Sequence, residues 1–275
     1  MSLRTKLLVS LAVVVVLGIS LASSAVYRFA RNELEASKRR QLTRDAKMLA
    51  RQTEAWLQIS KSNVALWTDL RLVREVALNP GNAASAAEAC AFFRRIVEIG
   101  GVYQTVNLMG LDAACLASSV PSRIGLKRMQ QVVATRFYFK EALAGKAVIA
   151  PMFTSASNGR TTIAISAPVF EGAKVIAVIY AIIDMAFFDD VLLKPEEVRS
   201  AGRSGILDPK FVESKDATYL KYRDISDIFI RGKKYLPLEI PVPAAEFARE
   251  SGIIQYHDEK KGDFLAAFHR IREPE

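Results

Sequence analysis

Cysteine and histidine are both scarce in this chain, with two of each among 275 residues. Two cysteines cannot form a disulfide scaffold, and two histidines leave little for an ordinary zinc site. The sequence also lacks a G-x-S-x-G elbow, a P-loop, an H-E-x-x-H pair and a dinucleotide fingerprint. These absences favour a protein that is not an enzyme, and we expect neither a cofactor nor a metal.

The composition is that of a globular protein, with 51% hydrophobic and 24% charged residues, which excludes a wholly disordered chain. Lys and Arg number 38 against 29 Asp and Glu, and residues 1–60 alone hold ten basic and four acidic side chains. A nucleic-acid domain would gather its basic excess with aromatic residues on a folded face. Here most of the excess flanks an apolar run, so we expect a membrane surface rather than a nucleic-acid partner.

The apolar run is Leu7–Tyr27, which contains 21 residues without a charge. A helix of this length spans a hydrocarbon core of about 30 Å, which predicts a membrane anchor. The alternative is a cleaved signal peptide, with Leu7–Leu21 as its apolar core and small residues at Ser23–Ala25 before the cut. We favour the uncleaved anchor, and both interpretations place the following residues outside the cytoplasm.

The basic residues beside this run point the other way. Seven Lys and Arg lie between Arg28 and Lys47, against two that precede the run. The positive-inside rule counts such residues near the helix ends, and by charge alone the C-terminal side is cytoplasmic. The outside assignment therefore rests on the family resemblance described below.

A long helix, or two stacked helices, is predicted over Asn32–Leu78, which has no Pro or Gly and ends at Asn79–Asn82, an Asn-Pro-Gly-Asn turn. Steps of three and four residues place one stripe of side chains on a common face. The stripe consists of Leu42, Ala46, Leu49, Thr53, Trp56, Ser60, Asn63, Trp67 and Leu70. It packs either on its own domain or along a second copy in a parallel dimer.

The remaining sequence mixes helical and strand patterns, which predicts an α+β fold. Helices are predicted over 84–99 and 185–193, a helical or mixed segment over 127–143, and strands over 102–109, 114–119, 148–154, 161–170 and 175–183. Turns at Ser155–Gly159 and Glu171-Gly172 make the last three strands an antiparallel meander, with helices expected on one face. A shorter strand set over 204–207, 235–240, 252–257 and 264–270 predicts a second, smaller unit.

One block is more specific than the rest. Arg136–Val169, RFYFKEALAGKAVIAPMFTSASNGRTTIAISAPV, resembles the double Cache (dCache) extracytoplasmic sensor domains of bacterial transmembrane receptors. The resemblance continues through Ala177–Asp184, Ser204–Pro209 and Ser251–Tyr256 and covers roughly residues 30–272. It implies a transmembrane helix and a long helix followed by two PAS-like antiparallel-sheet modules. The implied order is a cytoplasmic N-terminus (1–6), a transmembrane helix (7–27), a signalling and dimerisation helix (28–78), a membrane-distal ligand-binding module (79–193) and a membrane-proximal module (194–275).

The resemblance also implies a ligand site in the distal module. One branch of the family holds amino acids with Tyr-x4-Arg-x-Trp-Tyr followed by a Tyr and an Asp. The corresponding residues here are Gln131, Arg136, Tyr138, Phe139, Phe153 and Asp184. A guanidinium binds a carboxylate bidentately, and a carboxylate pairs with an ammonium, so Arg136 and Asp184 together suit a zwitterion. Gln131 departs from the pattern because the leading Tyr is lost.

Several of these residues also have a purely structural interpretation. Arg136 is alternatively a surface residue or the partner of Asp184, and Phe139 and Phe153 are alternatively core side chains. Asp184 is alternatively the N-cap of the helix that follows it. Elsewhere, Cys90 and Cys115 are expected as two buried thiols, with a disulfide as the alternative. His257 and His269 have no metal-ligand spacing.

The function implied is a sensor anchored in the inner membrane, with its sensor portion periplasmic. It binds a small molecule, an amino acid or another small carboxylate, and transmits the signal across the membrane as a homodimer. Receptors of this family continue into a second span and an output domain, so we expect a receptor truncated before them or a stand-alone sensor. The rival hypotheses are a tethered or secreted solute-binding protein, an enzyme without a recognisable motif, and a partner-binding module.

Overall fold

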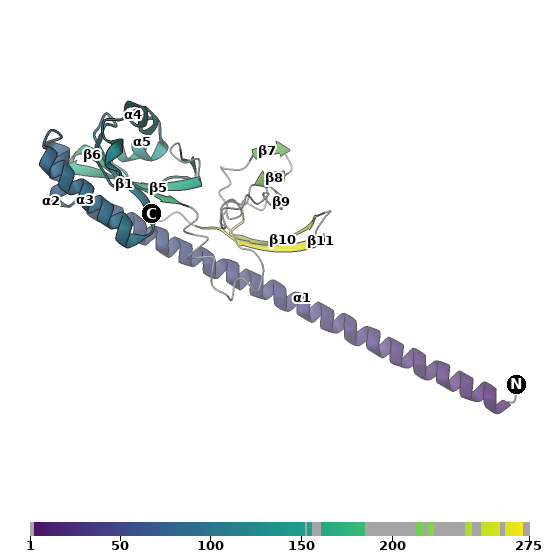
Figure 1. Cartoon of the computed structure of the whole chain (residues 1–275). Helices are drawn as coiled ribbons and strands as arrows, with labels where there is room; N and C mark the ends of the chain where they lie inside the picture. Colours follow the sequence, from purple (N-terminus) through teal and green to yellow (C-terminus); the bar gives the residue numbers. More distant parts are fainter. Residues whose placement is uncertain are drawn as a thin grey trace. The chain divides into compact units, whose positions relative to one another are not determined.

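The computed structural model describes residues 3–151, 153–155, 161–184, 213–216, 219–222, 240–243, 249–258 and 262–271. The chain divides into two compact units. One combines Met1–Lys47 with Ser251–Phe268, and the other combines Met48–Glu250 with His269–Glu275. A continuous helix, α1 (Leu3–Thr68), contributes residues to both units (Figure 1).

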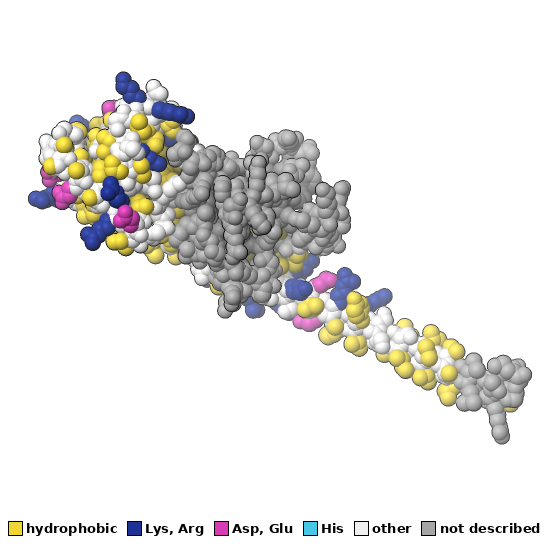
Figure 2. Space-filling model, viewed as in Figure 1, with side chains coloured by type: hydrophobic (Ala, Val, Ile, Leu, Met, Phe, Trp, Pro, Cys, Tyr) yellow, Lys and Arg dark blue, Asp and Glu magenta, His cyan; other side chains and the backbone are white. Residues whose placement is uncertain are grey.

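In the first unit, α1 contains the predicted apolar run. Its side chains from Leu11 to Leu21 are exposed, and Figure 2 shows them as a hydrophobic stretch followed by basic residues. Within the described residues, this is one helix long and apolar enough to cross a membrane, by length and composition. Residues 7–27 are thus helical, within a helix that continues without a break into the predicted signalling helix, and their assignment as a membrane span stays a prediction.

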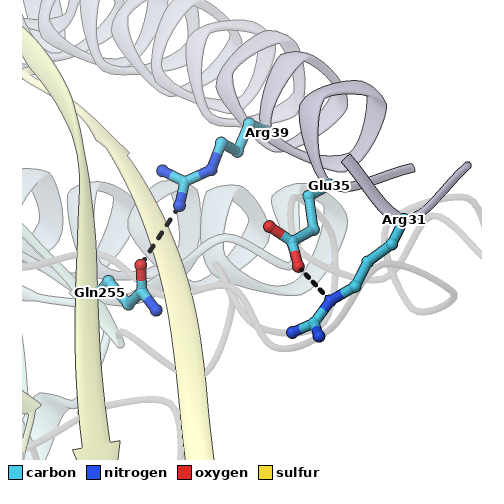
Figure 3. A network of polar contacts seen from close by, with 4 residues as sticks. All are labelled: Arg31, Glu35, Arg39 and Gln255. Atoms are coloured by element: carbon cyan, nitrogen blue, oxygen red, sulfur yellow. Dashed lines mark hydrogen bonds and ion pairs between the residues drawn. The ribbon is translucent and has the colours of Figure 1, made fainter. Parts of the chain in front are cut away.

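The first unit also contains a pair of strands, β10 (Ser251–Asp258) and β11 (Gly262–His269). They correspond to the last two predicted strands. Arg39 of α1 donates a hydrogen bond of 3.2 Å from Nη2 to Oε1 of Gln255 in β10. On the same helix, Nε of Arg31 pairs with Oε1 of Glu35 at 3.1 Å, and Glu35 lies one turn before Arg39 (Figure 3). Both contacts are exposed to solvent and are expected to contribute little to stability, and only the Arg39–Gln255 contact joins the helix to the strand pair.

In the second unit, the end of α1 is followed by α2 (Arg71–Leu78) and α3 (Ala83–Gly100). The break at residues 69–70 divides the predicted Asn32–Leu78 helix in two. Thr53 and Ser60 of the predicted stripe are buried, and Trp56 and Trp67 pack against the core. This part of the stripe therefore packs on its own domain, which was one of the two interpretations.

The caps of α3 agree with its sequence. The side chain of Asn82 accepts hydrogen bonds from the backbone N–H groups of Ala84 and Ser85 and so caps the helix start. At the other end Gly101 has a φ of 60°, the left-handed conformation that ends many helices. This turn directs the chain from α3 into the first strand of the main sheet.

The main sheet has the order β2-β1-β6-β5-β3, with β4 also paired to β5, and all its described pairs are antiparallel. Its strands are β1 (Tyr103–Met109), β2 (Cys115–Ser118), β3 (Val148–Ile149), β4 (Phe153–Thr154), β5 (Thr161–Glu171) and β6 (Lys174–Asp184). The predicted β5–β6 hairpin is confirmed, with Gly172 at a φ of 58° in its turn.

Helices cover both faces of this sheet, so the expectation of helices on one face was wrong (Figure 1). One face packs on α1, α2 and α3 through apolar side chains such as Ile165, Ile179 and Leu108. The other packs on α4 (Lys127–Ala134) and α5 (Phe137–Leu143). The reason is that β5 and β6 are buried on both faces, as continuous apolar strands require.

The predicted second module is described only in part. A three-stranded sheet has the order β7-β8-β9, built from β7 (Glu213–Asp216), β8 (Tyr219–Tyr222) and β9 (Ile240–Pro243). The first two of these strands were not predicted. The predicted helix at 185–193 and strand at 204–207 lie outside the described residues, as do residues 235–239 of another predicted strand and residues 156–159 of the first hairpin turn. The boundaries at 78/79 and 193/194 stay predictions.

Candidate ligand-binding site

The second face of the main sheet carries a pocket beneath α4 and α5. Its volume is about 400 Å³, which includes space open to solvent. The lining residues come from β1, β4, β6, the two helices and the loop before them. They are Gln104, Thr105, Arg123, Met129, Val132, Val133, Arg136, Tyr138, Phe153, Ser155, Tyr180 and Ile182. A mostly apolar wall with a few polar anchors is typical of small-molecule sites.

Arg136 reaches this pocket because α4 and α5 are separate helices. Thr135 ends α4, where its hydroxyl donates to the carbonyl of Val132 at 2.9 Å. Arg136 then has an extended backbone, with φ −74° and ψ 140°, at the N-cap position of α5. A single helix over Lys127–Leu143, one of the predicted possibilities, would turn this side chain in another direction.

Three aromatic rings form one wall of the pocket. The centroid of the Tyr138 ring lies 5.7 Å from that of Phe153 and 5.0 Å from that of Tyr180. The guanidinium carbon of Arg136 lies 4.8 Å from the centroid of Phe153, within the range of a cation–π interaction. Ser166 of β5 fixes α5 on the sheet by donating a hydrogen bond of 2.8 Å to the carbonyl of Tyr138.

The two tyrosine hydroxyls are buried and hydrogen-bonded to each other. Burial raises the pKa of Tyr138 to about 12, opposed in part by the neighbouring Arg136 guanidinium and by the hydrogen bond from Tyr180. Burial likewise raises the pKa of Tyr180 well above its ordinary value. Both hydroxyls are therefore neutral at physiological pH and can act as hydrogen-bond donors or acceptors toward a ligand.

A second arginine enters the pocket from η1 (Pro121–Arg123), the short 3-10 helix before α4. Its Nη1 donates a hydrogen bond of 3.1 Å to Oγ1 of Thr105 in β1. The same oxygen accepts a hydrogen bond of 3.2 Å from Nδ2 of Asn107. Ser118 of β2 completes the chain, because its hydroxyl donates to Oδ1 of Asn107 at 2.7 Å. Thr105, Asn107 and Ser118 are all buried, so this network fixes the floor of the pocket.

Three of the six predicted site residues line the pocket: Arg136, Tyr138 and Phe153. Phe139 does not line it: this side chain is 2% exposed and belongs to the core cluster on this face of the sheet. Gln131 is exposed on α4 and is not in the lining.

Asp184 is the sixth predicted residue. It ends β6 opposite Thr162 of β5. Its side chain lies outside the described part of the chain, and so does the helix that it was alternatively predicted to cap.

Arg123, Thr105 and Tyr180 also line the pocket and were not among the predicted site residues. A signal for Thr105 was present, since Thr105 and Asn107 are polar residues at alternate positions of a strand and so lie on one of its faces. Two polar residues on one face of a buried strand indicate a polar partner there. Arg123 carries no such signal, because only the fold brings η1 over β1.

The described residues contain no group of three His, Cys, Asp or Glu side chains arranged to hold a metal. Cys90 and Cys115 are both free thiols. Burial raises the pKa of the Cys115 thiol to about 12, which makes it unreactive. The interpretation as two free thiols is confirmed, although only Cys90 is buried and Cys115 is half-buried.

No protein-family model matches the chain, and no curated protein matches its sequence. Solved structures do match. The sensor domain of the Vibrio cholerae histidine kinase DctB is 12% identical, with 87% of this chain and 100% of that one covered and a TM-score of 0.50. A domain of a sensory box/GGDEF family protein from Vibrio parahaemolyticus is 11% identical over 59% of this chain and 66% of that one, also at 0.50.

The sensory domain of the Campylobacter jejuni chemoreceptor Tlp3, solved with isoleucine bound, is 15% identical, with 64% and 68% of the two chains covered and a TM-score of 0.47. This chain thus spans about two thirds of the Tlp3 and Vibrio parahaemolyticus domains. At these identities the likeness concerns the fold. The predicted resemblance is confirmed at that level by the two structures with a TM-score of 0.50: the chain has the fold of double Cache-type sensor domains.

Proposed function

We propose that this protein is an extracytoplasmic sensor domain that binds a small carboxylate in the pocket between β1, β6 and α5. The observation that carries the proposal is the position of Arg136, whose guanidinium lies over the Phe153 ring at the edge of that pocket. A guanidinium held on an aromatic face still presents its N–H edge, which matches a carboxylate bidentately. The neutral Tyr138 hydroxyl beside it, which accepts a hydrogen bond from Tyr180, supplies one further donor.

An amino acid is one ligand of this class, and its ammonium needs an anionic partner. Asp184 is the candidate for that role because it ends the strand that carries Tyr180 and Ile182 into the pocket. A carboxylate without an ammonium needs no such partner. The proposed ligand class is therefore the carboxylates. Binding measurements with amino acids and with simple organic acids would show which of the two kinds the pocket prefers.

The sensor portion is proposed to lie outside the cytoplasm, with α1 as both anchor and output. A continuous helix from Leu3 to Thr68 links the apolar run to the residues that pack under the pocket. A ligand changes the output only if it binds one conformation more tightly than the other. Protease treatment of intact spheroplasts tests the topology: an externally added protease should digest the chain, whereas a protected chain contradicts the assignment.

A homodimer along α1 is proposed through the face opposite the buried stripe. Met48, Ile59 and Leu66 are 40%, 60% and 64% exposed, and they lie eleven and seven residues apart, which are sums of three- and four-residue steps. A shared membrane would hold two such helices parallel. Ile59→Glu should then weaken a dimer seen by cross-linking in membranes. Ala55→Glu, at the adjoining exposed position, is expected to act in the same direction, and Glu54→Gln on the flank is the control.

Ligand binding is tested on the full chain in lipid nanodiscs by thermal unfolding. The only two tryptophans, Trp56 and Trp67, both pack against the core under the pocket, so their fluorescence follows this unit alone. A ligand at about a hundred times its Kd stabilises the folded state by about 2.7 kcal/mol.

A carboxylate that raises the unfolding temperature should lose its effect in Arg136→Ala but keep it in Arg128→Ala, an exposed arginine of α4. Equal shifts in the two variants would remove Arg136 from the site. A folded sample that responds to no carboxylate would contradict the proposed function.

A further inference from the structure

We propose that the outer surface of α4 and α5 is a docking site for a protein partner whose own face is acidic with an apolar centre. The site, called the α4–α5 surface below, is formed by exposed residues of the two helices and of the loop before α4. They are Ile124, Leu126, Lys127, Arg128, Phe137 and Lys140. None of them lines the carboxylate pocket, so this inference does not depend on the proposed ligand.

The part of the chain that carries this surface is strongly basic. Residues 121–146 contain six Lys or Arg and one acidic residue, Glu141. The helices α2 and α3, on the opposite face of the sheet, contain four basic and three acidic residues. Figure 2 shows basic side chains protruding over the region of α4 and α5. The basic excess is therefore local to one face of the second unit, and it favours an anionic partner.

The cations of the α4–α5 surface are available to such a partner. In the described part of the chain, the side chains of Lys127, Arg128 and Lys140 form no hydrogen bond or ion pair. Lys146, which follows the end of α5, instead pairs with Glu141 at 3.2 Å. Exposed and unpaired charges act over about 8 Å at physiological salt. They attract an oppositely charged protein and raise the rate at which it associates.

Apolar side chains accompany these charges. Ile124, Leu126 and Phe137 are 42%, 51% and 51% exposed. The inward side of the two helices is filled by other residues, such as the buried Val133 and Ala142. Protein interfaces combine apolar and aromatic anchors with a charged rim, whereas a nucleic acid is held mainly through its phosphate charges. The presence of both kinds of residue on one surface therefore favours a protein.

Two other occupants fit this surface less well. A membrane-binding helix inserts a continuous apolar face into the headgroup region, but that face of α4 packs on the sheet through Met129 and Val133. A second copy of this chain, in a symmetric dimer, would bring an identical basic surface against the first, and like charges that face each other oppose association. The proposed occupant is therefore a different protein, with Asp and Glu side chains around an apolar centre.

The first experiment maps contacts in cells that make the protein naturally. The photo-reactive residue p-benzoylphenylalanine replaces Leu126, Phe137 or, as a control, Ala91, an exposed residue of α3. Irradiation of living cells joins this residue to a protein within its reach, and mass spectrometry identifies the product. We expect one protein of net negative charge to be cross-linked at Leu126 and at Phe137 but not at Ala91.

The second experiment measures the affinity of that purified protein for the full chain in nanodiscs by isothermal titration. Lys127→Glu combined with Arg128→Glu should weaken binding at least about tenfold and reduce its dependence on salt. Phe137→Ser should weaken it by about tenfold as well. The matched control combines Arg94→Glu with Arg95→Glu, two adjacent exposed arginines of α3, and should stay within about threefold of the wild type. If the first double variant does not fold, Lys127→Gln with Arg128→Gln tests the same point.

Several results would overturn this inference. One is the absence of a common cross-linked protein at the two positions, and another is a second copy of this chain as that protein. Equal losses of affinity in the α3 and α4 double variants would show that total charge, and not this surface, governs binding. Binding of phosphatidylglycerol vesicles that is lost in the α4 double variant, without a protein product, would assign the surface to a membrane. Each of these results leaves the proposed carboxylate pocket standing, because carboxylate binding is measured separately.

Discussion

The guanidinium of Arg136 lies over the ring of Phe153, with 4.8 Å between the guanidinium carbon and the ring centroid. The two residues are held by different elements, Arg136 by the start of α5 and Phe153 by β4. β4 pairs with β5, so the ring is fixed to the sheet while the arginine is fixed to the helix above it. Their contact therefore sets the direction in which the guanidinium faces the pocket.

Replacement of Phe153 with leucine should weaken carboxylate binding by about two- to fivefold. A cation–π contact at a partly exposed site contributes about 0.5–1 kcal/mol, and its loss allows the Arg136 side chain more conformations. Isothermal titration with the carboxylate that binds the wild-type chain measures the change. Phe170→Leu, at the partly exposed far end of β5, is the control and should leave affinity unchanged. A Phe153→Leu variant with wild-type affinity would show that the ring does not orient the arginine.

The buried tyrosine pair should make the protein less stable at alkaline pH. Burial raises the pKa of Tyr138 from an ordinary value near 10 to about 12. Between these pH values the unfolded chain loses the proton and the folded chain keeps it, so the free energy of unfolding falls as pH rises. The loss is about 2 kcal/mol from Tyr138 by pH 12, and Tyr180 shifts in the same direction.

Denaturant titrations followed by tryptophan fluorescence between about pH 8 and pH 12 measure this slope. Tyr138→Phe should make the slope shallower above pH 10, because the ionising group is gone. Tyr27→Phe, at an exposed position of α1, should leave it as in the wild type. Identical slopes in all three proteins would mean that the Tyr138 hydroxyl is not buried.

Much of the main sheet was predictable from the sequence because its signals are local. The turns at Gly110–Asp112 and Gly172 separate short runs, most of them rich in β-branched residues, which favour strands, and Asn82 and Gly101 mark the two ends of α3. The presence of helices on both faces of the main sheet was not predictable from such local signals. The sequence alone does not show that β5 and β6 are buried on both faces, because the elements that cover them lie far away in the chain. A continuous apolar run fits either a strand covered on both sides or a buried helix.

The pocket was partly predictable, for a similar reason. Arg136, Tyr138 and Phe153 lie within eighteen residues of one another, and a single sequence block identified them. Arg123 and Tyr180 join them through pairing between β1 and β6, which brings together residues about 75 positions apart. Phe139 was grouped with Tyr138 in the predicted site but is not among the residues that line this pocket, because adjacent residues of a helix point about 100° apart.

Asn107 should be important for stability as well as for the position of Arg123. Asn107→Ala removes both of its hydrogen bonds and leaves the hydroxyls of Thr105 and Ser118 short of partners in a buried site. Buried polar groups that lose a partner destabilise a protein by about 1–3 kcal/mol. Denaturant unfolding followed by tryptophan fluorescence measures the loss. Asn32→Ala, on the exposed surface of α1, should stay within about 0.5 kcal/mol of the wild type. The same small change for Asn107→Ala would mean that the network is solvated.

Two adjacent glycines at the end of α3, Gly100 and Gly101, provide a matched pair. An alanine should lower the free energy of unfolding at Gly101 but not at Gly100. Gly101 has a φ of 60°, so an alanine there is strained and should destabilise the fold by about 1 kcal/mol, although nothing lies within 4 Å of the added methyl group. Gly100 is the last residue of the helix. An alanine at that position meets only Cδ2 of Tyr103, at an ordinary contact distance of 3.7 Å, and should be neutral or stabilising by up to about 1 kcal/mol.

Thermal and denaturant unfolding of Gly100→Ala and Gly101→Ala give the two signs directly. The comparison bears on the site because this turn leads into β1, which carries Thr105 to the floor of the pocket. Carboxylate affinity should be unchanged in Gly100→Ala. Gly101→Ala should lower the free energy of unfolding, and it should lower carboxylate affinity only if the substitution also displaces β1. Equal destabilisation by both substitutions would show that the methyl group itself, and not the left-handed backbone at Gly101, is what the turn excludes.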